Sequence, residues 1–288
     1  MKLLRRPIVI LGAARSGTKM LRSLLAAHPA VSTVPWDVNF IWKYGNYAHP
    51  DDELDPRDLT ARTRQFIQRS LGQFQAPAST HLVEKTVGNT LRPAFVQAAL
   101  PGCVFVHLIR DGRDVAESAR RMWRAPMEWR AVAQKLRAFP PAALPTYGVQ
   151  YARAYVERRL GLRDGAVGTW GPRWRGIDRD VEVMPLIDVC ARQWVRSVET
   201  SRAWLADSAS APALEIRYEQ LCAQPVVEAR RLLEFVGLDP SEAVEEHASR
   251  TIVTTHQHKS RTGLTTDDLT AISAEAGPLL EQLGYLGK

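Results

Sequence analysis

A short apolar run, a glycine-bearing turn and an amphipathic segment follow one another at the start of this chain. Residues 7–12 (PIVILG) are apolar throughout and end in glycine, which is typical of a strand buried on both faces of a parallel sheet. From Gly17 to His28 the apolar residues recur at helical spacing, and Pro29 ends that segment. The order of strand, loop and helix indicates an α/β protein.

The rest of the chain repeats this alternation. Further strands are expected at residues 81–86, 104–109 and 213–217. Helices are expected at residues 17–28, 56–71, 91–100, 114–123, 185–206, 226–236, 241–249, 266–275 and 278–283. The pattern predicts a P-loop-like, doubly wound and mostly parallel sheet flanked by helices. Ligands of such sheets bind beyond the carboxyl ends of the strands.

Two stretches depart from the alternation. Residues 30–55 are rich in loop formers and aromatic residues. Residues 124–184 carry many Pro, Gly, Trp and Arg residues and predict a partly helical insertion over the functional edge of the sheet. The sequence contains no internal repeat and no long low-complexity stretch, so we expect one domain over residues 1–288 that includes this insertion.

Charge and cysteine content limit which binding partners and which cellular compartment are expected. The chain has 38 Lys and Arg against 31 Asp and Glu, a net charge of +7, which favours polyanionic partners. No nucleic-acid reader motif accompanies the charge, so we expect no nucleic-acid partner. Three widely spaced cysteines without a CxxC pair argue against a zinc or redox site and favour a reducing, cytoplasmic compartment. No apolar run approaches the ~20 residues of a membrane span, and the first is too short for a signal peptide.

The turn after the first predicted strand is a candidate anion site. Residues 12–19 (GAARSGTK) place backbone N–H groups at the positive end of the following helix. In the magnesium-nucleotide loop GxxxxGK[ST], lysine directly follows the second glycine. Here Thr18 follows Gly17 and Lys19 comes one place late, which argues against a kinase. An ordinary glycine turn is the other explanation.

Three segments together carry a family resemblance. Residues 14–29 (ARSGTKMLRSLLAAHP) are similar to the 5′-phosphosulfate loop of sulfotransferases that use 3′-phosphoadenosine 5′-phosphosulfate (PAPS). Residues 106–118 (VHLIRDGRDVAES) resemble the 3′-phosphate motif of that family, and residues 216–221 (IRYEQL) resemble its late YE-x-L element. Order and spacing agree, and the resemblance is to the Golgi-type and bacterial branch, which includes tyrosylprotein and carbohydrate sulfotransferases.

The resemblance implies a set of donor-binding residues. The first loop would hold the phosphosulfate, Arg110 and Ser118 the 3′-phosphate, and Tyr218 the adenosine side. Family members often close a late basic loop over the nucleotide, and Lys259 and Arg261 fall in the corresponding part of this chain. Arg121 matches a family arginine only with a shift of one place. The donor-binding residues are therefore expected to be Arg15, Ser16, Gly17, Thr18, Lys19, Arg110, Ser118, Arg121, Tyr218, Lys259 and Arg261.

Three residues are expected to serve the transfer step. Sulfuryl transfer needs cations where charge develops on the leaving phosphate, and a base for the acceptor proton. By resemblance, Arg15 and Lys85 supply the charge without a metal. Asp37 is the candidate base, although family members carry Glu there and the match needs a shift of one residue. An aspartate that orders its loop through backbone N–H groups is the alternative for Asp37.

The resemblance therefore implies a PAPS-dependent sulfotransferase with a hydroxyl acceptor. Aromatic residues at 36–47 and 170–174 beside arginines could stack on sugar rings, or could equally belong to the core. We expect a carbohydrate acceptor, ahead of tyrosine in a peptide or a small natural product. Two alternatives stay open. One is a P-loop kinase or other phosphotransferase, and the other is a protein that binds the nucleotide without catalysing transfer.

Overall fold

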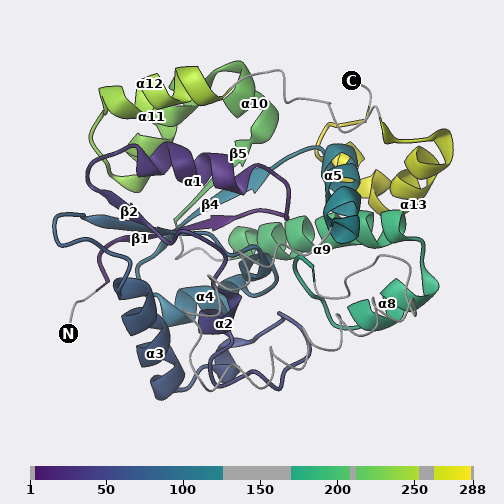
Figure 1. Cartoon of the computed structure of the whole chain (residues 1–288), viewed down its shortest axis with the longest axis horizontal. Helices are drawn as coiled ribbons and strands as arrows, with labels where there is room; N and C mark the ends of the chain where they lie inside the picture. Colours follow the sequence, from purple (N-terminus) through teal and green to yellow (C-terminus); the bar gives the residue numbers. More distant parts are fainter. Residues whose placement is uncertain (1–3, 126–169, 208–211, 253–262, 287–288) are drawn as a thin grey trace.

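A single parallel sheet forms the centre of the protein. The computed structural model describes residues 4–125, 170–207, 212–252 and 263–286. Within them the strand order is β2-β3-β1-β4-β5, and every neighbouring pair is parallel, which confirms the predicted α/β class (Figure 1). The strands are β1 (Pro7–Leu11), β2 (Val31–Thr33), β3 (His81–Glu84), β4 (Val104–Ile109) and β5 (Ala213–Arg217).

Helices cover both faces of the sheet, which explains why β1 is apolar along its whole length. Ile8 and Ile10 pack into one core cluster, while Val9 and Leu11 pack into the cluster on the opposite face. The first face is covered by α1 (Thr18–Ala26), α10 (Tyr218–Ala223), α11 (Pro225–Val236) and α12 (Glu242–Thr251). The second is covered by α2 (Asn39–Trp42), α3 (Ala61–Gly72) and α4 (Pro93–Ala99).

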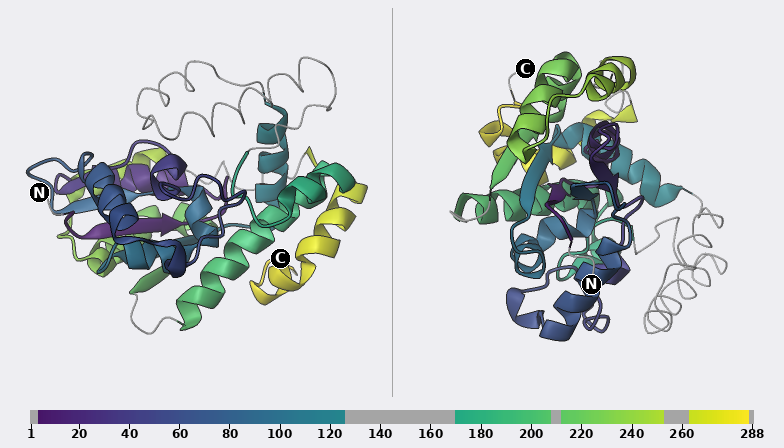
Figure 2. Two further views of the ribbon diagram at one scale, coloured as in Figure 1. Left: turned by 90° about the horizontal axis from the view of Figure 1, so that it is seen from below. Right: turned by 90° about the vertical axis from the view of Figure 1, so that its left-hand side faces the viewer.

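A third core cluster lies beside the sheet. It joins α5 (Gly112–Arg124), α8 (Ile177–Val183), α9 (Leu186–Asp207) and α13 (Thr266–Gln282) (Figure 2). The ring of Trp194 in α9 leaves room only for glycine at position 112, because a Cβ there would lie 2.6 Å from the ring. The Trp194 Nε1–H donates to the Arg110 carbonyl at 3.0 Å. Helix α9 therefore fixes the exit of β4, where the second predicted phosphate motif begins.

The described flanks of the central part of the predicted insertion meet. Residues 126–169 lie outside the described residues, and their flanks are in contact through Trp123 and Trp170, whose ring centroids are 6.3 Å apart. Trp123 is fully buried in the third core cluster. Of the described part of the insertion, α8 confirms that it is partly helical.

Several predicted boundaries differ from the structure. The predicted helix 56–71 begins as a 3-10 turn, η1 (Pro56–Asp58), capped by Asp55, and α3 starts separately with Thr60 as its cap. The two helices predicted at 266–275 and 278–283 are one helix, α13, which runs through Pro278. Neither β2 nor α10 was predicted, because each is short and β2 is only half-buried.

Candidate active site

The predicted functional residues lie at one edge of the sheet. Gly12 directly follows β1, Lys85 follows β3, Arg110 follows β4 and Tyr218 follows β5. Since all strands are parallel, their carboxyl ends point the same way, and this is the edge where ligands of such sheets bind.

The loop after β1 has the backbone geometry of an anion cradle. Arg15 and Gly17 have positive φ angles of 79° and 96°, so the chain turns sharply before α1 begins at Thr18. A Cβ on Gly17 would lie 2.7 Å from a ring carbon of Tyr218, so only glycine fits there. The Ser16 hydroxyl is fully buried and has no hydrogen-bond partner among the described residues. A buried hydroxyl of this kind fits a site whose remaining partner is an anionic oxygen of a ligand.

The two predicted phosphate motifs meet across this loop. The Nε of Arg15 donates to the Ser118 hydroxyl at 3.0 Å, although the two residues are 103 positions apart in the chain. Arg110 donates through Nη1 to the Arg15 carbonyl at 3.5 Å, and its guanidinium lies 4.3 Å from the centre of the Tyr218 ring. The structure thus brings Arg15, Ser118, Arg110 and Tyr218 together.

The cations of the site disfavour one another's charge. Burial lowers the pKa of Arg15, and the neighbouring Arg121 and Arg110 lower it further. The pKa of Lys19 is lowered by burial first and then by Lys85 and Arg15, while a nearby carboxylate opposes this. An entering anion would relieve this repulsion, so the site has the electrostatics of a polyanion site.

Helix α5 holds acidic partners next to these arginines. Arg110 Nη2 lies 3.7 Å from Asp114, and Arg121 Nε lies 3.9 Å from Glu117. The Arg121 side chain is 62% exposed at the outer end of the cluster, so a role in donor binding stays a prediction. Arg113 pairs with Asp111 at 2.8 Å, which fastens the start of α5.

The two remaining predicted transfer residues form an ion pair. Lys85 Nζ donates to both carboxylate oxygens of Asp37, each at 2.8 Å, although 48 positions separate them in the chain. Lys85 is 2% exposed and Asp37 is 33% exposed, so the pair opens to solvent on the carboxylate side. Asp37 also accepts the backbone N–H of Val87 at 3.0 Å. Asp37 therefore lies beside the predicted transfer site and also orders its loop.

Arg22 was missed by the sequence analysis. Its Nη1 donates to the carbonyl of Val34 at 3.0 Å and also to that of Pro35. These bonds fasten the loop that carries Asp37 to α1. The available signal was helical spacing, since Arg22 is one turn beyond Lys19 and on the same face of α1.

The predicted late clamp, Lys259 and Arg261, lies outside the described residues. Its C-terminal flank is placed, however. The Arg120 side chain donates to the Gly263 carbonyl at 3.0 Å and pairs with Asp268 at 2.7 Å. The chain after the clamp thus rests on α5, the helix that carries Ser118.

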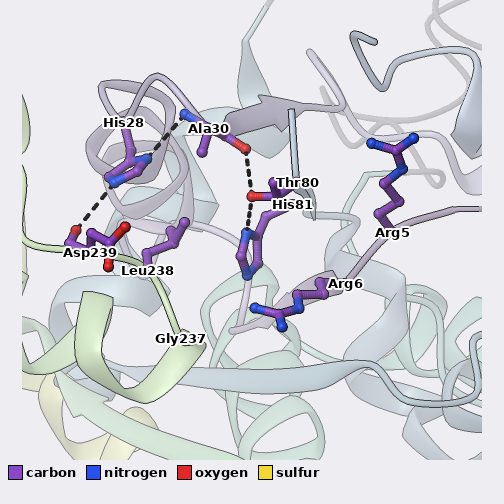
Figure 3. Close-up of a pocket in the computed structure, with 9 residues that line it drawn as sticks. All are labelled: Arg5, Arg6, His28, Ala30, Thr80, His81, Gly237, Leu238 and Asp239. Carbon is purple, nitrogen blue, oxygen red and sulfur yellow. Dashed lines mark hydrogen bonds between the residues drawn. The ribbon is translucent and has the colours of Figure 1, made fainter. Parts of the chain in front are cut away.

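A separate cavity lies at the opposite, amino-terminal edge of the sheet (Figure 3). His28 Nδ1 accepts the Ala30 N–H at 3.1 Å, and its Nε2 donates to the Asp239 carbonyl at 3.2 Å. Both ring nitrogens are therefore used by the backbone, and His28 is the helix-end residue that the sequence predicted. The cavity is lined by Arg5, Arg6, His28, Ala30, Thr80, His81, Gly237, Leu238 and Asp239.

Three further features of the described part of the chain concern cysteine pairs, metal-ligand clusters and membrane-spanning helices. Cys103, Cys190 and Cys222 are buried free thiols. Among the placed residues, no group of three or more His, Cys, Asp or Glu side chains is arranged to hold a metal ion. No helix in the described ranges combines the length and apolarity needed to cross a membrane.

Solved structures share this fold at low sequence identity. The sulfotransferase domain from the curacin biosynthetic pathway superposes with a TM-score of 0.52 at 16% identity, covering 98% of each chain. Sulfotransferase STF9 from Mycobacterium avium gives a TM-score of 0.54 at 13% identity, covering 97% of this chain and 77% of that one. Sulfotransferase STF1 from Mycobacterium tuberculosis gives 0.52 at 15%, covering 96% and 78%. At these identities the likeness concerns the fold alone.

Sequence comparison adds the family. A search among curated proteins found no match. Residues 7–167, over half of the chain, match the model of the sulfotransferase family, and the match begins at β1 and runs through both predicted phosphate motifs. The loop after β1 and the arginines around it lie within the matched residues, and the chain is a member of the sulfotransferase family.

Proposed function

We propose that this protein transfers a sulfuryl group from PAPS to a hydroxyl acceptor, and that the acceptor is a carbohydrate rather than a tyrosine or a small natural product. The observation that carries the donor assignment is the convergence of Arg15, Ser118 and Arg110 on a loop whose buried Ser16 hydroxyl has no partner among the described residues. PAPS is a polyanion with two separate phosphate groups. Two separate basic motifs that meet at one edge match that pattern.

Each motif would hold one end of the donor. The backbone N–H groups of residues 17–19 and the Ser16 hydroxyl, with Arg15 and Lys19, would bind the phosphosulfate. Arg110 and Ser118 would bind the 3′-phosphate, and the Tyr218 ring beside them would pack near the adenosine. Arg121, Lys259 and Arg261 would close over the nucleotide.

Transfer would then proceed in line. The acceptor oxygen forms a bond to sulfur while the bond from sulfur to the 5′-phosphate oxygen breaks, and the phosphate keeps that electron pair. Arg15 and Lys85 would stabilise the charge that develops on the leaving phosphate. Asp37 would take the proton of the acceptor hydroxyl. For this, Lys85 must turn from Asp37 towards the donor, which would free a carboxylate oxygen.

The proposal includes transfer without a metal ion. Four cations, Arg15, Lys19, Lys85 and Arg110, are close enough to influence one another and provide the charge that magnesium supplies in a kinase. The proposal also places the protein in the cytoplasm, because its buried free cysteines suit a reducing compartment.

A thermal-stability measurement tests the donor assignment. Adenosine 3′,5′-bisphosphate should raise the melting temperature without magnesium, because a ligand of the folded state stabilises it. Strong stabilisation by ATP with magnesium, and none by the bisphosphate, would replace the proposal with a kinase. Incubation with PAPS and a panel of carbohydrate, peptide and small phenolic acceptors then tests transfer. Stabilisation without transfer to any acceptor would favour a binding protein.

A further inference from the structure

We propose that Glu84 and Thr86 are positioning residues, which hold Asp37 in the orientation needed to receive the acceptor proton. This inference rests on the proposed function, because it assumes that the pair of Asp37 and Lys85 serves the transfer. Neither residue touches the place expected for the donor phosphates. Both act on the pair indirectly, through bonds to residues that are adjacent to Asp37 and Lys85 in the chain.

Glu84 is a fully buried carboxylate at the end of β3. Its Oε1 accepts the indole N–H of Trp42 at 3.1 Å and the Thr86 hydroxyl, and its Oε2 accepts the amide of Asn89 at 2.9 Å. Burial raises the pKa of Glu84, while the hydrogen bonds from Thr86 and Trp42 oppose that shift. An apolar residue of similar volume usually serves stability as well as a buried charge does, so packing alone does not explain this carboxylate.

Thr86 transmits the position of Glu84 to the loop that carries Asp37. Its Oγ1 accepts the backbone N–H of Val38 at 3.0 Å, so its own hydrogen is available to donate to Glu84. Val38 directly follows Asp37, and Thr86 directly follows Lys85. The hydrogen-bond chain therefore joins the two segments immediately beside the ion pair.

Further hydrogen bonds, to the Asp37 carboxylate, join the same two segments a second time and complete a ring of hydrogen bonds. Asp37 Oδ1 accepts the Val87 N–H at 3.0 Å, and both Asp37 oxygens accept from Lys85. Asp37 is thus held at two points, by the bonds to its carboxylate and by the bond from the Val38 N–H to Thr86. Thr86 lies in the chain between Lys85 and Val87, the two residues that bind the carboxylate. A base must be held to a fraction of an ångström for efficient proton transfer, so loosening this ring should affect turnover before donor binding.

The experiment compares three variants of the full chain. Thr86→Val keeps the shape and removes the hydroxyl, and Thr86→Ser restores the hydroxyl. Thr63→Val is the matched control, because Thr63 in α3 is also buried but its hydroxyl bonds Thr60, the N-cap of that helix. Hydrogen exchange at the Val87 amide reports the Asp37 contact without any need for activity. Steady-state transfer from PAPS and calorimetry with adenosine 3′,5′-bisphosphate report turnover and donor affinity.

We expect Thr86→Val to speed exchange at Val87 and to lower kcat by about tenfold to a hundredfold, as for other supporting residues. The affinity for the bisphosphate and the KM for PAPS should stay within about twofold of wild type. Thr86→Ser should regain most of the turnover, and Thr63→Val should keep it. Unchanged exchange at Val87, or equal losses of kcat in Thr86→Val and Thr63→Val, would overturn the inference. If wild type transfers no sulfuryl group, the proposed function fails, whereas the exchange data still decide whether Thr86 holds Asp37.

Discussion

The Nε of Arg15 donates to the hydroxyl of Ser118 at 3.0 Å, so the first loop and α5 are joined directly. A donor with two phosphate groups would contact both residues at once. Each motif then depends on the other for its geometry, and substitutions in either should affect binding at both ends of the nucleotide. Nucleotide affinity and turnover should therefore be measured separately for each substitution in the site.

Arg110→Ala should weaken binding of adenosine 3′,5′-bisphosphate by about tenfold or more, because it removes a charge-assisted contact to phosphate. Calorimetry measures the dissociation constant. Arg230→Ala is the matched control, since Arg230 is an exposed arginine that pairs with Glu245 between α11 and α12. Both variants lose one positive charge, so equal affinities would remove Arg110 from the site.

Asp37→Asn should lower turnover by about a hundredfold, because an amide cannot take the acceptor proton. Asparagine keeps an oxygen for Lys85 and for the Val87 N–H, so the loop should stay ordered and bisphosphate affinity should change little. Single-turnover transfer from PAPS measures the step. Near-normal turnover would show that Asp37 is structural and that another group takes the proton.

Gly17→Ala should destabilise the protein by about 1–3 kcal/mol and weaken bisphosphate binding, because alanine disfavours a φ of 96° and its Cβ would meet the Tyr218 ring. Urea unfolding gives the free energy. The control is Gly102→Ala, where φ is also positive, at 78°, but an added Cβ meets nothing within 4 Å. That substitution should cost only the backbone strain, about 1 kcal/mol, and should leave bisphosphate affinity unchanged. A stable Gly17→Ala protein with unchanged affinity would contradict the assigned cradle.

Glu84→Gln should separate stability from activity. The folded-state pKa of Glu84 is raised above the unfolded value of about 4.3. Protonation of Glu84 therefore adds to the free energy of unfolding below that value, and this contribution is lost as pH rises through the folded-state pKa. Glutamine removes the buried charge but replaces one accepting oxygen by an NH2 group, so it loses the bond from Asn89 at every pH. The melting temperature of the variant should therefore move upwards relative to wild type as pH rises from 4 to 7, while its turnover should fall. A melting-temperature difference that stays constant over this range would contradict the raised pKa of Glu84.

Acid should destabilise the protein partly through His107. This residue is fully buried in β4, and burial lowers its pKa despite Glu215 at 3.6 Å. The unfolded chain therefore binds a proton more readily, so stability should fall as pH drops through about 6.5. As pH falls from 8 to 5, the melting temperature should decline less steeply in His107→Leu than in wild type. A residual slope is expected from His81, whose pKa burial also lowers. Parallel curves for variant and wild type would rule out His107.

The buried strands were the easiest elements to predict. The runs that became β1 and β4 are almost wholly apolar because helices cover both faces, and a strong pattern of this kind needs no tertiary information. The three half-buried residues of β2 carry no such pattern. Their pairing depends on β3, which lies about fifty positions away and supplies the hydrogen bonds.

The site was predictable in its residues more than in its contacts. Arg15 lies in the loop after β1 and Arg110 directly follows β4, whereas Ser118, in the middle of α5, was found through the family resemblance. The ion pair of Lys85 and Asp37 depends on how the exit of β3 meets the loop after β2, which only the folded sheet decides. Glu84 looked like a strand residue, since the sequence does not reveal that Trp42, Thr86 and Asn89 all turn their donors towards it.

The contact between Trp123 and Trp170 has a consequence for evolution and engineering. Because the chain leaves and re-enters the core at neighbouring points, the segment between them can change in length or composition at small entropic cost to the donor site. If that segment covers the acceptor side, as the sequence predicts, acceptor preference can diverge by exchange of the segment alone, while the sheet edge and its arginines are inherited intact. A chimaera that carries another family member's segment between Ala125 and Trp170 would then acquire that member's acceptor specificity.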